Sequence, residues 1–61
     1  MEPLHPRLTD ILDLARQRGR VEVEWLASQF EVTPQTIRKD LNDLCDRQLL
    51  QRIHGGAVYP S

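Results

Sequence analysis

The sequence has almost no cysteine, and this scarcity limits what can stabilise the fold. Cys45 is the single cysteine among 61 residues, so an internal disulfide is impossible. The two histidines, His5 and His54, do not combine with Cys45 at the spacing of a zinc site. We therefore expect no metal and no cofactor, and a small core that depends on apolar packing alone.

Long apolar runs and an export signal are also missing. No stretch of the chain is apolar enough for long enough to span a bilayer. Residues 1–6 contain no basic segment followed by an apolar one, as a signal peptide would. Together with an unprotected thiol, these absences favour a cytoplasmic location.

The chain has no excess of positive charge that would by itself suggest a nucleic-acid partner. Its net charge is −1 at pH 7. Residues 1–32 carry four arginines against six acidic residues, and residues 33–61 carry four basic residues against three acidic ones. Because the second half is only weakly basic, a DNA-binding function needs support from geometry.

Apolar spacing predicts a first helix over about residues 6–18. Its apolar positions recur at i, i+3, i+4 and i+7, namely Leu8, Ile11, Leu12 and Ala15. Pro6 suits the first helical turn, and Gly19 can adopt the left-handed conformation that ends helices. The short segment 20–22 is rich in β-formers and could add one small strand.

Two further helices follow, separated by a very short connection. The same spacing predicts a helix over about 23–30, with Val23, Leu26, Ala27 and Phe30 on its apolar side. Thr33 as N-cap and Pro34 in the first turn predict the start of a helix over about 34–47. The apolar side of that helix consists of Ile37, Leu41 and Leu44. A short helix, a tight turn and a capped longer helix form a helix-turn-helix, whose second helix can enter a DNA major groove.

The end of the chain changes to a β pattern. Residues 49–53 predict a strand, and residues 57–59 predict a returning strand that Pro60 stops. His54-Gly55-Gly56 between them predicts a turn that requires positive φ. We therefore predict a single domain over residues 1–61, mainly α with a small β-hairpin. This is a winged helix-turn-helix, in which the hairpin over about 49–59 is the wing.

The third helix supplies the candidate DNA contacts. At 100° per residue, the side opposite the apolar stripe carries Gln35, Lys39, Asn42 and Asp46, which we call the outward face. Base contacts in such motifs come from the amino-terminal end of the helix, which selects Gln35, Thr36 and Lys39. Arg38 can reach sideways to a phosphate, and free N–H groups near Thr33 can bind another. The alternative for these polar residues is a solvated helix face.

The wing supplies a second set of candidates. We expect Arg52, His54, Gly55 and Gly56 to approach the DNA backbone or minor groove. His54 could instead serve only in turn packing. A similar His-Gly-Gly string forms oxyanion holes in α/β-hydrolases, but this chain lacks the G-x-S-x-G motif and the large sheet that such enzymes need. We also expect Asp40, which would repel DNA, to pair with Arg52.

The residues that carry a family resemblance lie in two separated motifs. The run from Phe30 to Leu41, FEVTPQTIRKDL, is followed by HGGA at residues 54–57. With this spacing the chain resembles the DeoR family of bacterial repressors from about Arg7 to Ser61. Gln48 departs from the family, because many members have glycine there.

The resemblance implies a function and a set of partners. Members bind double-stranded operator DNA through a winged helix, and a second domain senses a sugar phosphate. The chain would then be the operator-binding domain of a repressor of sugar or sugar-phosphate catabolism, with glycerol-3-phosphate as one candidate. The effector domain is expected to be absent from these 61 residues. The full-length protein is expected to be a homo-oligomer and the isolated domain a monomer.

Two residues and one other function class stay open at this stage. Cys45 is a half-buried filler or a redox sensor, and Trp25 packs across the first helix or anchors another domain. A winged helix can also serve purely as a protein-docking module, which the net charge of −1 permits. An enzyme is not expected, because the sequence offers no nucleophile–base pair, no metal ligands and no room for a pocket.

Overall fold

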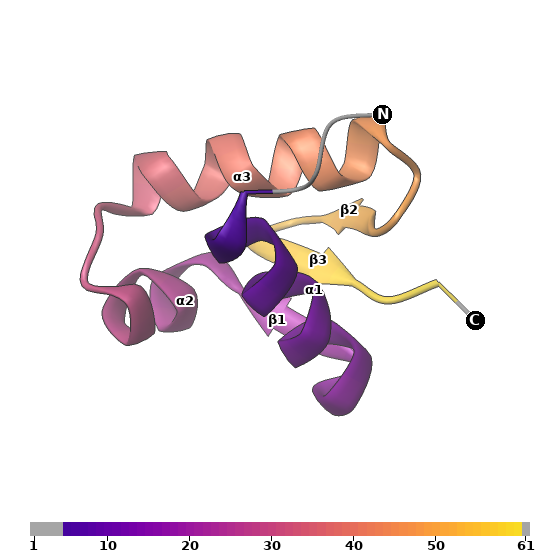
Figure 1. Ribbon diagram of the computed structural model, residues 1–61, viewed down its shortest axis with the longest axis horizontal. Helices are drawn as coiled ribbons and strands as arrows, with labels where there is room; N and C mark the ends of the chain where they lie inside the picture. Colours follow the sequence, from indigo (N-terminus) through magenta and orange to yellow (C-terminus); the bar gives the residue numbers. More distant parts are fainter. Residues whose placement is uncertain (1–4, 61) are drawn as a thin grey trace.

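The computed structural model describes residues 5–60, which form three helices and three short strands. In chain order these are α1 (Pro6–Arg18), β1 (Arg20–Glu22), α2 (Val23–Phe30), α3 (Pro34–Asp46), β2 (Gln51–Ile53) and β3 (Gly56–Val58) (Figure 1). The predicted winged helix-turn-helix is confirmed, with α2 and α3 as the helix-turn-helix and the hairpin of β2 and β3 as the wing. The sequence predicts no export signal in residues 1–6. Residues 1–4 of that segment lie outside the part of the chain that the structure describes.

The helices begin where the sequence predicts them, and α1 and α3 begin at residues whose side chains satisfy a free backbone N–H. His5 precedes α1, and its Nδ1 accepts a hydrogen bond of 3.1 Å from the amide of Arg7. Pro6 and Pro34 occupy the first turns of α1 and α3, where a missing N–H costs nothing. None of the described helices has the length and apolarity needed to cross a membrane.

The helices end with residues in the left-handed conformation, and only one of these residues is glycine. Gly19 follows α1 with φ of 84°. Glu31 follows α2 with φ of 55°, and Gln48 follows α3 with φ of 62°. At the end of α3 the amide of Gln48 donates to Cys45 O over 2.9 Å, and that of Leu49 donates to Leu44 O over 3.0 Å. This is the Schellman pattern, which normally favours glycine at the left-handed position.

The hairpin is part of a three-stranded antiparallel sheet in the order β1-β3-β2. The segment 20–22 does form a strand, and it pairs with β3 rather than standing alone. In the centre of the sheet, Ala57 lies opposite Val21 on one side and Arg52 on the other. The wing is therefore attached to the body of the domain through β1, which connects α1 to α2.

The core lies where the three helices meet the sheet, and all its buried side chains are apolar. Among the described residues these are Leu8, Ile11, Ala15, Val21, Val23, Leu26, Ala27, Ile37, Leu41, Leu44, Leu50 and Ala57. They include most of the apolar positions that helical spacing predicts. Because no polar side chain is fully buried in residues 5–60, apolar packing is the main source of the core's stability.

Three predicted elements have boundaries that are wrong by one or two residues. Helix α3 ends at Asp46 rather than 47, since Arg47 is already the C-cap. Strand β2 begins at Gln51 rather than 49, because the amide of Leu49 closes the end of α3 instead of entering the sheet. Strand β3 runs from Gly56 to Val58, so it both begins and ends one residue earlier than predicted.

Candidate nucleic-acid interface

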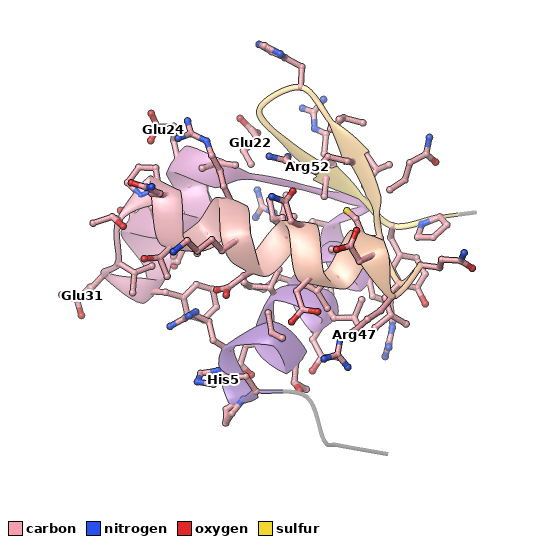
Figure 2. All side chains as sticks on the ribbon, turned by 90° about the horizontal axis from the view of Figure 1, so that it is seen from above. His5, Glu22, Glu24, Glu31, Arg47 and Arg52 are labelled. Atoms are coloured by element: carbon pink, nitrogen blue, oxygen red, sulfur yellow. The ribbon has the colours of Figure 1, made fainter. Side chains whose placement is uncertain are left out.

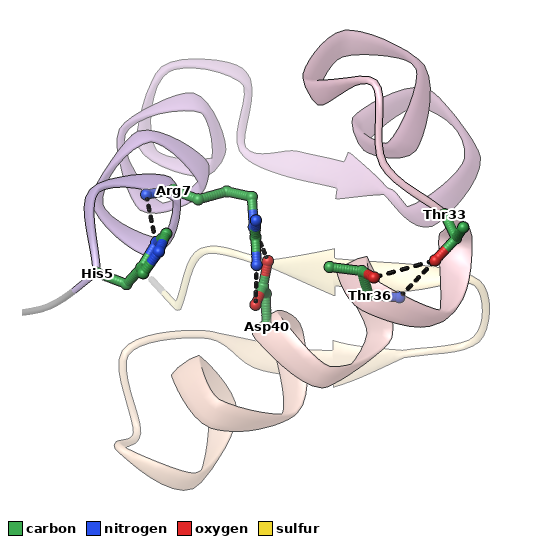
Figure 3. A network of polar contacts seen from close by, with 5 residues as sticks. All are labelled: His5, Arg7, Thr33, Thr36 and Asp40. Atoms are coloured by element: carbon green, nitrogen blue, oxygen red, sulfur yellow. Dashed lines mark hydrogen bonds and ion pairs between the residues drawn. The ribbon is translucent and has the colours of Figure 1, made fainter.

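The amino-terminal end of α3 is organised by a threonine pair. Thr33 Oγ1 accepts a hydrogen bond of 3.3 Å from the Thr36 amide, which confirms Thr33 as the N-cap (Figure 3). The two hydroxyl oxygens also lie 3.0 Å apart. The Thr36 hydroxyl is therefore engaged within the first turn of α3.

The first half of α3 carries side chains that have no partner within the domain. Gln35, Arg38 and Lys39 are exposed, and no residue in the range 5–60 forms a hydrogen bond or ion pair with their side chains. Helix α3 runs along one edge of the molecule, with the other helices and the sheet on its opposite side (Figure 1). The outward face of α3 is therefore open along the helix.

Asp40 does not pair with Arg52, so that prediction is wrong. Its carboxylate instead binds Arg7 at the start of α1, with Arg7 Nη2 donating to Oδ1 over 3.2 Å and Nε donating to Oδ2 (Figure 3). The hydrogen bond to Asp40 and its negative charge raise the pKa of Arg7, against an opposing effect of burial. This pair joins α1 to the middle of α3.

Arg52 has a different set of partners, on the opposite flank of α3. Its Nε donates to Asn42 Oδ1 over 3.3 Å, and its Nη1 donates to the carbonyl oxygens of Ile53, at 3.2 Å, and of Gly56. Asp40 and Asn42 are two residues apart, which places them about 200° apart around a helix. A side chain from the wing can thus reach Asn42 while Asp40 faces α1.

The wing tip is formed by His54 and Gly55, which are both exposed. Gly55 has φ of 76°, so its position in the turn does require the conformation predicted. Its carbonyl oxygen accepts a hydrogen bond of 2.9 Å from the amide of Val23. The wing tip is therefore tied to the first residue of α2, where Glu22 provides no side-chain cap.

The expectation that Gly56 requires a positive φ is wrong. Gly56 does not have a positive φ; it is buried as the first residue of β3, between β1 and β2. A Cβ atom there would lie 2.1 Å from the carbonyl oxygen of Val21. Glycine is needed there because two backbones approach closely, and Gly56 is buried rather than displayed at the wing tip.

Trp25 and Cys45 both lie half-buried against the core. The guanidinium of Arg18, at the end of α1, stacks 4.1 Å from the centre of the Trp25 ring. The tryptophan thus packs against α1, as one of the two readings proposed. Burial raises the pKa of the Cys45 thiol, an effect that the positive charge of Arg52 opposes. No group of side chains in residues 5–60 has the composition and proximity of a metal site.

Two residues of the surface were not among the predicted site residues. Arg7 acts on α3 through Asp40, and nothing in the sequence pattern indicates this long-range pair. Asn42 did carry a signal, because it lies on the outward face of α3, but it is too far from the helix start to be selected. Glu22 and Glu24 lie on the same side of the molecule as Arg52 and the wing, so the surface is not uniformly positive (Figure 2).

Comparison with known proteins places this geometry among regulators of transcription. Residues 7–61 match the family model described as the DeoR-like helix-turn-helix domain. The glycerol-3-phosphate regulon repressor of Escherichia coli (strain K12) is 49% identical over 55 residues, which is 90% of this chain and 22% of that protein. The repressor of the same name from Haemophilus influenzae is 47% identical over 51 residues, 84% of this chain and 20% of the relative.

A third relative shows that the resemblance is not limited to repressors. The L-fucose operon activator of Haemophilus influenzae is 46% identical over 48 residues, which is 79% of this chain and 19% of that protein. The chain thus spans about a fifth of the length of the curated relatives it matches. These relatives are named as regulators rather than as enzymes. No solved structure matches the chain.

Proposed function

Because the chain belongs to the DeoR-like helix-turn-helix domains, we propose that α3 recognises operator bases in the major groove while the wing contacts the backbone. The chain is a DNA-binding domain of the kind found in transcription repressors. One observation supports the assignment of base recognition to α3 most strongly. The first half of α3 presents Gln35, Arg38 and Lys39 at an open edge of the molecule, without partners in residues 5–60.

We assign base recognition to the side chains nearest the start of α3. Gln35 can form two hydrogen bonds with the edge of an adenine, and the Thr36 methyl can contact a thymine methyl. Lys39, one turn further along the outward face, can donate to a guanine edge or a phosphate. A mutation in this group should change the preference among DNA sequences.

We assign backbone contacts to the residues that flank this group. Arg38 is exposed beside the outward face, and the N–H groups near Thr33 can bind a phosphate. On the wing, Arg52, His54 and Gly55 are exposed and can contact phosphate or the minor groove. Gly56 takes no part in this proposal because it is buried.

The test is a salt series of binding to double-stranded DNA. Release of counterions from a few phosphates should give a slope of log K against log salt of roughly −3 to −5. Arg38→Ala, which removes a proposed phosphate contact, should make the slope shallower by about one. Gln17→Ala, on the exposed surface of α1, is the control and should not change it. Binding that is absent at low salt, or indifferent to salt, would instead favour a protein-docking module.

We propose the wider role from the family and from the relatives' names. In a longer protein, this domain would act with an effector domain that binds a sugar phosphate, glycerol-3-phosphate being the first candidate. Such a protein would work in the cytoplasm as a homo-oligomer, whereas this domain alone would be a monomer that contacts one half-site. If the longer protein released operator DNA when glycerol-3-phosphate was added, but not when free phosphate was added, that result would support the assignment.

A further inference from the structure

Arg52 and Asn42 connect the wing to the outward face of α3. The Nε and Nη1 atoms of Arg52 are occupied by Asn42 Oδ1 and by two carbonyl oxygens that flank the wing turn. The side chain is thus bound at once to the hairpin and to the helix. Seen from above α3, Arg52 lies between the wing and the helix (Figure 2). The position of Arg52 is therefore set by its own hairpin as well as by α3.

These contacts determine what the two side chains can still offer. The acceptor of the Asn42 amide points to Arg52, so the Nδ2 group, with two N–H donors, points away from it. Arg52 Nη2 keeps two further donors, and no residue in the range 5–60 accepts from either nitrogen. Both residues are exposed. The junction therefore presents hydrogen-bond donors and one positive charge, while the Asn42 oxygen is turned toward Arg52.

Donors without a competing acceptor are what an anionic oxygen requires. Lys39 lies three residues before Asn42 on the same outward face and adds positive charge, while Asp46 lies four residues after it, at the far end of the helix. A DNA strand that leaves the start of α3 toward the wing would bring a backbone phosphate to this junction. Along the outward face, such a strand would reach Asn42 next after Lys39.

We propose that Asn42 and Arg52 form one phosphate-binding site at the junction of α3 and the wing. This rests on the proposed DNA-binding function and adds Asn42 to the contacts. Arg52 has two roles in it: it supplies charge, and it fixes the Asn42 amide so that the donors face the DNA. Asn42 in return holds the guanidinium over the helix. The two residues should therefore depend on each other for binding.

The experiment uses the 61-residue chain and a random-sequence duplex of about two helical turns, because a phosphate contact does not depend on base sequence. Asn42→Ala, Arg52→Ala, the double variant and Arg52→Lys are compared at one fixed salt concentration. Asn42→Ala should bind about 3- to 10-fold more weakly. The double variant should lose less than the product of the two single losses, and Arg52→Lys should not restore full affinity, because lysine lacks the planar fork.

A second variant separates binding from folding. Asn42→Asp keeps an acceptor for Arg52 but removes both donors, so the melting temperature should not fall while DNA affinity drops more than in Asn42→Ala. Gln17→Glu adds the same charge on the exposed surface of α1, outside the outward face and the wing, and should cost less than about 2-fold because salt screens exposed charges.

The outcomes are distinguishable. Three results would overturn the joint site and leave the proposed function intact. In the first, Asn42→Ala binds as tightly as the wild type. In the others, the losses of the two single variants multiply in the double variant, or Asn42→Asp loses no more affinity than Gln17→Glu. A wild-type chain that fails to bind the duplex at low salt would overturn both.

Discussion

Arg7 and Asp40 join the first turn of α1 to the middle of α3 through two hydrogen bonds from one guanidinium to one carboxylate. Arg7 Nη2 lies 3.2 Å from Asp40 Oδ1, and the side chains are only 28% and 13% exposed. A pair so placed fixes the rotation of α3, since Asp40 must face α1. The orientation of the outward face therefore depends in part on a residue 33 positions earlier in the chain.

We predict that removing either partner destabilises the domain. Arg7→Ala and Asp40→Ala should each lower the free energy of unfolding by about 1–2 kcal/mol, because the partner is left half-buried and unpaired. The double variant should be less destabilised than the sum. Asp43→Ala is the matched control: it breaks an exposed pair with Arg47 on the same helix and should cost no more than about 0.5 kcal/mol. Urea titrations measure all four, and additive losses would show that the pair does not couple the helices.

The two adjacent glycines of the wing should respond differently to alanine. Gly56→Ala places a methyl group against the Val21 carbonyl, a backbone atom of the sheet that cannot move alone, and should cost about 3 kcal/mol or more. Gly55→Ala meets no atom within 4 Å and should cost only about 1 kcal/mol for its left-handed conformation. Thermal unfolding followed by circular dichroism distinguishes them. Equal shifts in melting temperature would contradict the assignment of Gly56 to close packing.

Gln48→Gly should stabilise the domain. Gln48 has φ of 62°, which side-chain-bearing residues adopt at a cost and glycine adopts freely. After subtraction of the entropy that glycine loses on folding, the gain should be roughly 0.5–1 kcal/mol. That corresponds to a rise in melting temperature of about 2–8 °C for a domain of this size. Gln51→Gly, in a strand without a positive φ, is the control and should lower it.

Variants of two residues in the first half of α3 should distinguish base recognition from backbone contact. The amide of Gln35 is expected to form a bidentate pair with a base. Gln35→Ala should therefore reduce the difference in binding free energy between operator and random duplex by about 1–3 kcal/mol, which lowers the ratio of the two affinities. Arg38→Ala should weaken both duplexes alike and keep the ratio. The affinities of the wild type and both variants for the two duplexes, measured at one fixed salt concentration, test this. An unchanged ratio in Gln35→Ala would mean that Gln35 does not contact a base.

The Cys45 thiol should make stability fall at alkaline pH. Burial raises its pKa, so the folded state holds the proton more tightly than the unfolded state does. The free energy of unfolding should then decrease as the pH rises above the ordinary thiol value of about 8.5. Urea titrations of the wild type and of Cys45→Ala across that range measure the difference. Parallel pH profiles of the two proteins would contradict this.

Several features of this protein follow from the sequence alone, because they depend on neighbours along the chain. The spacing of Leu8, Ile11 and Ala15 locates α1, since one helical face repeats every three to four residues. Thr33 and Pro34 mark the start of α3, because a cap acts within a single turn. The positive φ at Gly55 is also a local feature that the sequence predicts. The same holds for the two family motifs, at residues 30–41 and 54–57. Together they predict the fold and the DNA-binding surface.

The tertiary structure decided which distant residues meet. Asp40 could pair with any arginine within reach, and only the packing of α1 across α3 brings Arg7 to it and leaves Arg52 for Asn42. Gly56 looks like a turn glycine in the sequence, but the pairing of β1 with β3 makes it a site of close backbone contact. Helical and strand periods show the direction of a side chain, whereas its partner depends on how the elements pack. The sequence thus determined the elements and the outward face of α3, and packing alone determined the contacts that hold that face in place.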